Sequence, residues 1–553
     1  MAIKVGFEPP KGIQAGMSRT YATIINGDFL EKVEPYEKWR NIVFAICFLH
    51  SIVYERRKFG PLGFCVPYEF NASDLEASLT FVENHMNAAS LGISQIQWKA
   101  IVYMVCDIQY GGRITDGIDR EMFSTYGQLW LNPKVFDETN FNFNTMSEFP
   151  YYIPDVVEIQ KYQEYINSFP EKDSPVIFGL NISADLTFRI NESKKMIDTL
   201  IDTAPKQSGG GTGKTKEEEV KDMCQNLAKQ LPDDFIEVEY KEALSRLQVP
   251  KGLSATKQVP LNVFLRQEIE QFQRVLDIVR VTFKDLVLAI DGQITMTTEI
   301  LEVISNIFDF RVPKNWILDP TGSVEISWLC PTLGGWMKGL NDRHFQLNNW
   351  LTKGRPPSFW LTGFYNQQGF LTCANQEITR QNADNNWSLD SVKQWFEPIK
   401  ETITSDDGKI EKNIQAPSEG VYIHGLYLEG ATWTKGRLDE QTGKDLYQTF
   451  PIVHVTAISL AQNDNQRPAV GARRTDPLQQ TANYFDCVVY KYPKRSDKYK
   501  ITRMLLKPDA STQQERGGAA NRGGGGNESN LPAGMSPKIN WKLKGVALLC
   551  AKE

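Results

Sequence analysis

The sequence lacks the residue patterns of the common catalytic and metal-binding sites. Its 553 residues include only five histidines and eight cysteines, and no two cysteines form a CxxC pair. No histidine has the spacing to a cysteine or carboxylate that is typical of a metal site, and neither HExxH nor GxSxG occurs. We therefore expect reduced thiols, no bound metal and no catalytic residues in this sequence.

Long apolar runs and an excess of one charge are also missing. The longest apolar stretch, IVFAICFLHSIV at 42–53, is too short to span a bilayer, and the N-terminus has no apolar signal segment. The formal net charge of −6 gives no general attraction to nucleic acid or to an anionic membrane. The composition is typical of a globular protein, and we expect neither nucleic acid nor a membrane as its partner.

Most of the first 300 residues have the pattern of buried helices. Apolar residues crowd the segment 36–58, which ends in a basic cluster and is stopped at Gly60. A second helix is expected to begin at Asn71 or Ser73, either of which can act as its N-cap. The longest element runs over 261–291 without glycine or proline. Its apolar residues recur at steps of four and three, which predicts a helix packed on its own domain or, less favoured, a coiled coil.

Short β-like segments dominate the sequence after residue 418. Between about 315 and that point, tryptophan-rich segments with frequent glycine and proline predict short helices and turns. The stretch at 509–537 is a low-complexity loop, too polar to bury a core. The predicted fold class is mixed: an all-α region, then an α+β region with a helical part and a small antiparallel β-barrel or sheet. The segments that predict strands are GVYIHGLYLEGATW, FPIVHVTAISL, YFDCVVYKY, YKITRMLL and LKGVALLCA.

The segment SGGGTGKT at 208–215 nearly matches a phosphate-binding P-loop. A P-loop would use glycine amides to hold phosphates, Lys214 for the terminal phosphate and Thr215 for Mg²⁺. However, Ser208 stands where the motif needs its first glycine, and a helical stretch precedes the loop where the motif needs a buried strand. We therefore interpret Lys214 and Thr215 as part of a solvent loop, with a P-loop nucleotide-binding protein as the least favoured alternative.

Two other segments carry dense charged or aromatic residues. YGGRITDGIDRE at 110–121 places charges beside a glycine pair, a set that binds phosphate or holds a turn; neighbouring opposite charges that satisfy one another favour the turn. GRPPSFWLTGFY at 354–365 could stack on bases or sugars, but aromatic residues at this density more often build a core or an interface. Chemistry alone therefore indicates a non-catalytic packing domain.

Taken in order along the sequence, these segments resemble dynein heavy chains. FEPPKGIQAGMSRTY is similar to the exit from the sixth AAA+ module, and FAICFLHSIVYERRKFGPLGFCVPYEFNASDLEAS to the start of its helical lid, in which YGGRITDGIDRE is a family hallmark. FPEKDSPVIFGLNISADLTF resembles the opening of the C-terminal domain. The segments that follow in the family's order are LPDDF, FLRQEIEQFQRVLDIVR, RVPKNW, GRPPSFWLTGFYNQQGFLT, EGVYIHGLYLEGATW and LKGVALL.

The resemblance implies four regions and a subtype. The regions are an exit segment of the sixth AAA+ module (1–20), a helical AAA+ lid (21–154), a helical part of the dynein C-terminal domain (155–415) and its β-rich end (416–553). FLRQEIEQFQRVL and GFYNQQGFLT are most similar to axonemal outer-arm heavy chains of the gamma type. Relatives carry a similar glycine-rich loop in the C-terminal domain, which accounts for the false P-loop. Met1 falls inside a module, which suggests either a truncated sequence or one piece of a larger polypeptide.

By this resemblance, the whole protein would be a minus-end-directed microtubule motor ATPase that drives ciliary movement. ATP and Mg would belong to the missing part of the motor, and this segment would be a non-catalytic structural and regulatory part of the AAA+ ring. The implied partners are the rest of the ring and, through the parent complex, microtubules and dynein intermediate and light chains. The implied location is the axoneme of a cilium or flagellum, after assembly in the cytoplasm. A free-standing adaptor with the same fold is the alternative.

Packing, and not chemistry, is the role expected of the residues singled out in this sequence. The main packing surfaces are predicted on the helix at 261–291 and on the aromatic segment at 350–371. The structural positions are Phe59, Gly60, Tyr110, Gly111, Gly112, Arg113, Asp116, Phe272, Leu276, Trp360, Gly363 and Phe364.

Overall fold

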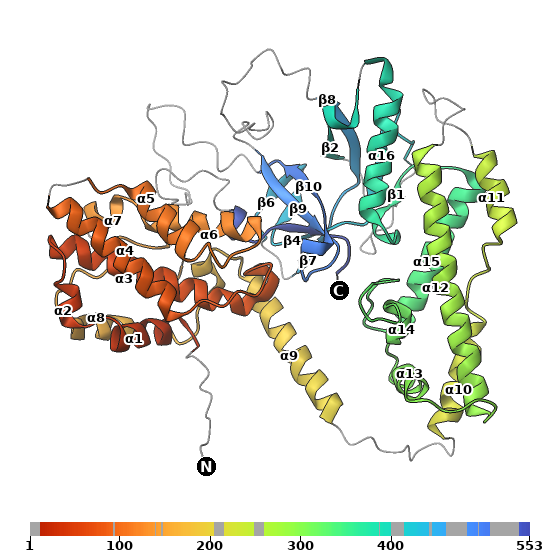
Figure 1. Cartoon of the computed structure of the whole chain (residues 1–553), viewed down its shortest axis with the longest axis horizontal. Helices are drawn as coiled ribbons and strands as arrows, with labels where there is room; N and C mark the ends of the chain where they lie inside the picture. Colours follow the sequence, from red (N-terminus) through yellow and green to blue (C-terminus); the bar gives the residue numbers. More distant parts are fainter. Residues whose placement is uncertain are drawn as a thin grey trace.

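The computed structural model places a helical group, a sheet region and a second helical group side by side (Figure 1). The predicted loop at 509–537 and Lys214 lie outside the residues that the structure describes. Among the described residues, no helix is long and apolar enough to cross a membrane. The described residues are 11–91, 95–138, 140–144, 147–203, 215–247, 259–385, 387–399, 414–441, 445–459, 484–495, 497–508 and 541–552.

The first helical group is built around helix α3 (Tyr36–Arg56). Most side chains of α3 are buried, because apolar residues occupy all of its faces and neighbouring helices surround it. Helix α4 (Ala72–Ser90) begins with a capping box in which Asn71 and Asp74 each accept the other's backbone N–H, so Asn71 is the N-cap. The other elements of this group are α1 (Ile13–Thr23), α2 (Gly27–Leu30), η1 (Arg57–Leu62), α5 (Trp98–Val102), η2 (Tyr103–Gln109), α6 (Gly117–Trp130), α7 (Lys134–Asp137), α8 (Ile159–Asn167) and η3 (Pro175–Phe178).

One segment of this group departs from regular α-helix geometry. The sequence WKAIVYMVCDIQY forms the short helix α5 and then a π-helix, η2, in place of one continuous α-helix. At its end the N–H of Tyr110 donates to the carbonyl of Val105, five residues earlier. The wider turn changes which side chains face the core directly before the YGGR turn, a detail that apolar spacing alone does not predict.

The second helical group is organised on helix α12 (Pro260–Ile290). The predicted apolar face is buried from Leu265 to Leu286, with Phe272 and Leu276 fully inaccessible. This face packs against helices of the same region, namely α10 (Lys216–Ala228), α15 (Leu333–Lys353) and α16 (Gln367–Gln381). The intradomain interpretation of this long helix is therefore confirmed over the described part of the protein.

Helix α15 corrects the prediction of short helices and turns in the tryptophan-rich region. It continues for 21 residues because Trp336, Leu340, Leu347 and Trp350 bury along one face, which outweighs the low helix propensity of its glycines. The remaining elements of the second group are α11 (Glu237–Arg246), α13 (Thr298–Phe308), α14 (Lys314–Ile317), η4 (Leu361–Gly363), η5 (Ala383–Asn385) and η6 (Leu389–Ser391). Helix α9 (Ser183–Thr203) begins against η1 and the core of the first group.

The C-terminal part contains two mixed sheets and a hairpin, which confirms the α+β class. The sheet orders are β1-β3-β8-β2 and β10-β9-β11-β4-β7, and β5 pairs with β6. The pairs β1–β3 and β11–β9 are parallel, so the expectation of a purely antiparallel sheet is wrong, and the described sheets do not close into a barrel. The strands are β1 (Phe359–Trp360), β2 (Val392–Pro398), β3 (Val421–His424), β4 (Tyr427–Glu429), β5 (Thr432–Thr434), β6 (Arg437–Asp439), β7 (Tyr447–Thr449), β8 (Val453–Ser459), β9 (Phe485–Tyr490), β10 (Lys500–Leu506) and β11 (Ala547–Leu549).

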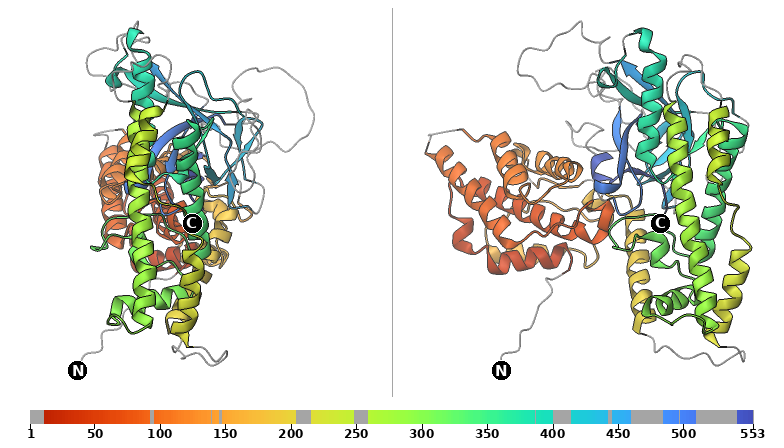
Figure 2. Two further views of the ribbon diagram at one scale, coloured as in Figure 1. Left: turned by 90° about the vertical axis from the view of Figure 1, so that its right-hand side faces the viewer. Right: turned by 45° about the vertical axis from the view of Figure 1, so that its right-hand side comes forward.

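The last strand, β11, occupies the centre of the five-stranded sheet. Leu548 pairs with Val489 of β9 on one side and with Leu428 of β4 on the other. The sheet lies between the first helical group and the second (Figure 2). The segment that leads into β11 therefore decides how the sheet is attached to its neighbours.

A buried carboxylate joins α12 to the start of α16. Glu268 is 3% exposed, and its oxygens accept the N–H groups of Tyr365 and Asn366 at 2.7 and 3.1 Å. Arg343 of α15 is also buried, with its guanidinium 3.6 Å from the ring centroid of Trp328. Burial raises the pKa of the Glu268 carboxyl to about 7 and lowers the pKa of Arg343 to about 10.

We predict that Glu268 makes the protein less stable as pH rises from 4.5 to about 7. In this window the unfolded polypeptide has released the proton that the folded state still holds, so each added pH unit favours unfolding by about 1 kcal/mol. Denaturant unfolding of wild type and Glu268→Gln across this range tests the prediction, because the comparison cancels the contributions of the histidines. The stability of wild type relative to the variant should fall as pH rises; a constant difference would contradict the assignment.

Candidate functional site

The junction between the first helical group and the five-stranded sheet concentrates the unusual features of the protein. Residues 541–546 run directly into β11. Within this segment, the side chain of Leu543 belongs to the core of the first helical group, while Trp541 and Val546 belong to the core of the C-terminal part. The segment is therefore shared by two cores. We call residues 541–546, together with the side chains that bind them, the junction.

Arg56, the last residue of α3, binds this segment. Its side chain is 1% exposed and donates to Leu543 O at 2.8 Å, to the carbonyl of Phe178, and to Gly63 O at 2.8 Å. It also donates to the hydroxyl of Tyr126 at 2.8 Å. All of these acceptors are neutral, so carbonyl dipoles and the C-terminal end of the α3 dipole stabilise the buried charge.

Two glycines allow the backbone segments at the junction to approach closely. A Cβ atom on Gly179, whose φ is +71°, would lie 2.7 Å from the Cβ of Leu543. A Cβ atom on Gly545, whose φ is +64°, would lie 2.8 Å from the carbonyl oxygen of Leu62. Any larger residue at either position would push the 541–546 segment away from Arg56.

On the sheet side, Arg495 holds the same segment. It forms a buried ion pair with Glu429, at the end of β4, and donates to Gly545 O at 2.6 Å. Burial opposes the charge, but the adjacent Glu429 carboxylate more than offsets this and raises the pKa of Arg495. Arg56 therefore hydrogen-bonds to the carbonyl of residue 543 from the helical group, and Arg495 hydrogen-bonds to the carbonyl of residue 545 from the sheet side.

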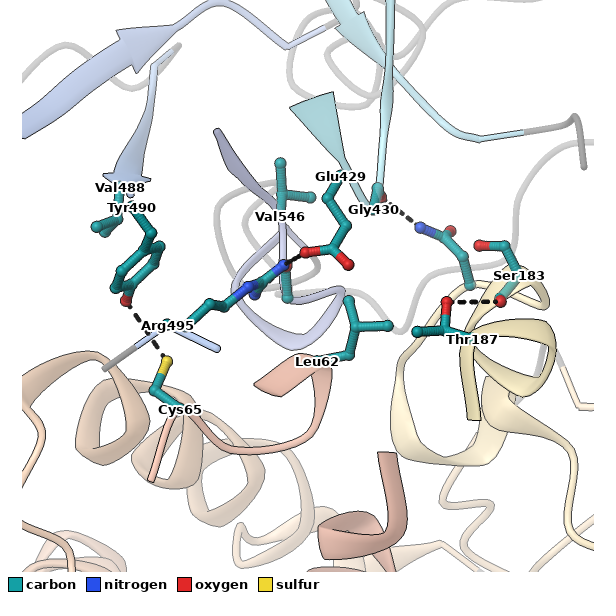
Figure 3. A network of polar contacts seen from close by, with 12 residues as sticks. Leu62, Cys65, Ser183, Thr187, Glu429, Gly430, Val488, Tyr490, Arg495 and Val546 are labelled. Atoms are coloured by element: carbon teal, nitrogen blue, oxygen red, sulfur yellow. Dashed lines mark hydrogen bonds and ion pairs between the residues drawn. The ribbon is translucent and has the colours of Figure 1, made fainter. Parts of the chain in front are cut away.

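Several further polar contacts cross the junction (Figure 3). Cys65 Sγ lies 3.4 Å from the hydroxyl of Tyr490. Lys542 Nζ lies 3.0 Å from Glu121. Farther along, the side chain of Asn181 donates to the carbonyl of Gly430, at the end of β4. These contacts extend the attachment from the helices to β4 and β9.

Cys65, Asp116 and Asp119 lie close enough together to raise the question of a metal ion, since their ligand atoms all fall within 4.8 Å of one another. Burial raises the pKa of the Cys65 thiol to about 12, which keeps it protonated. Asp116 accepts the N–H groups of Ile118 and Asp119, while Asp119 accepts those of Cys65 and Val66. The cluster organises the α6 N-terminus and the loop before α4, and we assign no metal to it.

The predicted residues of the first helical group lie at the edge of the junction and beneath it. Phe59 packs on Phe178, with ring centroids 5.3 Å apart, and Gly60 bends the backbone with a φ of +56°. Tyr110 is fully buried and hydrogen-bonds to Nδ1 of His50 at 2.8 Å. Gly111 and Gly112 leave no room for a Cβ, because backbone carbonyls would lie 2.5 and 2.8 Å from it.

Several charged groups of the YGGRITDGIDRE segment bind groups outside the segment or in its backbone. Arg113 pairs with Asp74 of α4 at 2.9 Å, and Asp116 caps α6. Arg120 donates to backbone carbonyls, including that of Ile114 at 2.9 Å. The segment forms a turn, as favoured from the sequence, but its partners lie in α4 and in the backbone because the fold brings them nearer.

The predicted residues of the C-terminal domain lie elsewhere, in its helical core. Phe364 packs on Phe264 of α12, with centroids 5.0 Å apart, next to the buried Phe272 and Leu276. The Trp360 ring occupies the space beside Gly363, where a Cβ would lie 2.3 Å from Cε3. The structure thus does not bring this set together with the set in the first helical group.

The segment before α10 differs from a phosphate-binding loop in its described part. Helix α9 precedes it, and Thr215 is the N-cap of α10, where its hydroxyl accepts the N–H of Glu218 at 3.3 Å. The Glu218 carboxylate accepts the N–H of Thr215 in return, at 3.0 Å. The Thr215 hydroxyl therefore has a structural partner.

The residues that form the junction itself are not predicted from the sequence. In the sequence, Arg56 is one residue of the basic cluster that ends a predicted helix. No local pattern distinguishes Leu543, Gly545 or Arg495 from their neighbours. The one available signal is an arginine directly after an apolar helix, a position that is more often solvated. Its acceptors come from distant segments, and only the tertiary fold reveals them.

Comparisons with known proteins agree with the resemblance found in the sequence. The family model for the AAA lid domain of the dynein heavy chain matches residues 39–184, and the model for the C-terminal domain of the dynein heavy chain matches 190–550. Dynein axonemal heavy chain 8 of Homo sapiens is 36% identical over 99% of this protein and 11% of its own length. Dynein axonemal heavy chain 5 of Mus musculus is 36% identical over 100% of this protein and 10% of its own length.

A flagellar relative extends the comparison to the expected subtype. The dynein gamma chain of the flagellar outer arm of Chlamydomonas reinhardtii is 38% identical over 83% of this protein and 10% of its own length. The sequence thus spans about a tenth of the length of the curated relatives it matches. The similarity to axonemal heavy chains, with a gamma outer-arm member among them, is confirmed.

We predict that Arg56→Lys loosens the junction. A single ammonium cannot reach the carbonyls of Phe178 and Leu543 in the fork geometry of a guanidinium, so at least one buried acceptor loses its donor. The free energy of unfolding should fall by about 2–4 kcal/mol, and amide hydrogen exchange at 541–546 should accelerate. Arg19→Lys on the exposed face of α1 is the matched control. Unchanged exchange at 541–546 in Arg56→Lys would show that Arg56 does not hold the segment.

Proposed function

This chain belongs to the dynein heavy-chain family, as the lid and C-terminal portion of an axonemal heavy chain, and on that premise we propose that it bridges parts of the motor ring mechanically without hydrolysing ATP. The proposal rests on the observation that Arg56 and Arg495 both hydrogen-bond to backbone carbonyls of the 541–546 segment. A junction fixed by buried hydrogen bonds and an ion pair transmits displacement between the parts that it joins. Movement of the lid would therefore be passed to the central strand of the C-terminal sheet.

The parent protein, in this proposal, is a minus-end-directed microtubule motor of the ciliary outer arm. The names of the relatives, which are axonemal and flagellar outer-arm chains, support this assignment. ATP and Mg would act in the rest of the motor, and this segment would contact the remainder of the AAA+ ring. Microtubules and the intermediate and light chains would be reached through the parent complex, in the axoneme after assembly in the cytoplasm.

A structural role is supported by the state of the groups that could otherwise carry chemistry. His50 and His424 are half-buried and hydrogen-bonded to Tyr110 and Ser358, both at 2.8 Å, and desolvation lowers the pKa of each imidazole to about 4. Neither would be protonated near neutral pH, so neither can serve as a general acid there. The segment would act as a brake or synchroniser of the ring through its contacts.

The bridging function is tested in the full-length motor carrying Arg56→Lys. If the junction transmits lid movement, microtubule-stimulated ATP turnover should persist while gliding velocity per ATP hydrolysed falls, because part of each displacement is lost at the loosened contact. Arg19→Lys serves as the control for handling and expression. If amide exchange at 541–546 accelerates but gliding velocity and stall force do not change, the junction is loosened without any effect on force transmission. This result would overturn the proposal.

We predict that Lys214→Ala leaves ATP turnover of the full-length motor unchanged. A functional P-loop lysine contacts the terminal phosphates, and its loss abolishes nucleotide binding at that site. Because we interpret the segment as a solvent loop, ATP titration of the 553-residue protein should likewise give no saturable signal at this position. A saturable ATP signal in wild type that Lys214→Ala removes would restore the nucleotide-binding alternative.

A further inference from the structure

A groove of about 470 Å³ lies between α10 and α12, in the second helical group. The two helices run antiparallel. Lys221, near the start of α10, pairs with Asp291 after the end of α12 at 2.5 Å. Arg280 of α12 donates to Pro232 O, after the end of α10, at 2.9 Å. These two contacts lie about 16 Å apart along the helices, at about 1.5 Å per residue, which is the length of three helical turns.

The groove has a buried apolar floor and exposed rims. In the floor, Cys224 is 0% exposed and Phe283 is 4% exposed, and Val287 is half-buried. Ala228 of α10 and Lys284 of α12 stand at the rims and are exposed. A small-molecule site encloses most of its ligand, whereas this groove leaves one side of any occupant uncovered. An elongated element with one apolar face therefore fits it better than a small molecule.

The spacing of the lining residues matches the packing of a third helix. Cys224 and Ala228 are four residues apart on α10, and Leu231 follows three residues later. Phe283 and Val287 are four residues apart on α12. Side chains at these steps form the ridges of a helix surface, and a third helix packs between the ridges of two neighbouring helices in a bundle. The groove therefore fits a helix of about three turns whose apolar residues recur at i, i+4 and i+7.

The charges along the groove favour an acidic partner. Among the described residues that line it, Arg280 and Lys284 are cationic and none is acidic. Arg280 already pairs with Asp234. Lys284 forms no ion pair or hydrogen bond within the part of the protein that the structure describes. An Asp or Glu beside the apolar face of an incoming helix would pair with Lys284 and fix the orientation of that helix.

We propose that this groove holds an amphipathic helix from another part of the same heavy chain, with an acidic residue that pairs with Lys284. The inference rests on the proposed function, in which this portion contacts the rest of the ring. The sequence spans about a tenth of the length of its curated relatives, so a heavy chain of that length has most of its residues outside this portion. Three turns of helix bury much less than the roughly 1,600 Å² of a stable complex between separate proteins. A helix of the same polypeptide needs no such area, because the covalent connection raises its effective concentration.

Site-specific photo-crosslinking in the purified full-length motor identifies the occupant. Benzoylphenylalanine in place of Ala228 should form a cross-link with a peptide of the same heavy chain outside these 553 residues. Mass spectrometry should find apolar residues at the i, i+4 and i+7 spacing and an adjacent Asp or Glu in that peptide. The same probe in place of Gln267, exposed on α12 outside the groove, is the control and should not form this cross-link. A cross-link from Ala228 to a peptide within these residues, or to another protein, would overturn the proposal.

Thiol labelling decides the question if benzoylphenylalanine blocks the groove. Ala228→Cys should react with a maleimide about tenfold more slowly in the full-length motor than in the 553-residue protein, as for a groove that is free about a tenth of the time. Lys284→Glu should restore fast labelling in the motor because it repels the acidic residue, whereas Arg274→Glu on the exposed face of α12 should not. Equally fast labelling in both proteins, or slow labelling in the motor that Lys284→Glu leaves unchanged, would show that no acidic helix lies in the groove. Neither readout depends on gliding, so this inference and the bridging proposal can fail separately.

Discussion

The guanidinium of Arg56 is the interaction on which the arrangement of the protein depends. It is buried at the end of an apolar helix, and its acceptors are carbonyls and a hydroxyl with no carboxylate among them. Such a charge is tolerated only where several dipoles converge on it. The fold supplies them from separate segments, one of which lies 487 residues away in sequence. Removing any of these segments would leave a buried cation short of acceptors, so Arg56 requires the segments to stay together.

This requirement explains why the last strand of the protein is also part of its first helical group. Residues 541–546 place Leu543 in one core and Val546 in the other before entering the centre of the five-stranded sheet. Arg495 and Glu429 fix the same segment from the sheet side. The lid and the sheet are thus joined through main-chain atoms. In the motor ring of an axonemal dynein, such a connection suits a part that moves as a unit with its neighbour.

Local features of the fold could be predicted from the sequence, and long-range features could not. The apolar face of α12, the Asn71 cap and all five strand-bearing segments follow from spacing and turn residues within a single window. The full length of α15 could not be predicted in this way, because the burial of its tryptophans outweighs the low helix propensity of its glycines. The π-helix η2 could not be predicted either. Parallel pairing of β11 with β9 depends on where the backbone returns after a long excursion. The partners of Arg56 and Arg113 belong to other elements, so no local pattern contains them.

The central claim is that lid and C-terminal sheet move together, and electron cryomicroscopy of the complete motor in two nucleotide states tests it most directly. After superposition of the lid on α3 and α6, the account predicts that β4, β9 and β11 coincide in both states, with the contacts from Arg56 to Leu543 O and from Arg495 to Gly545 O retained. A rotation of the sheet relative to the lid between the two states, with either contact broken, would contradict it.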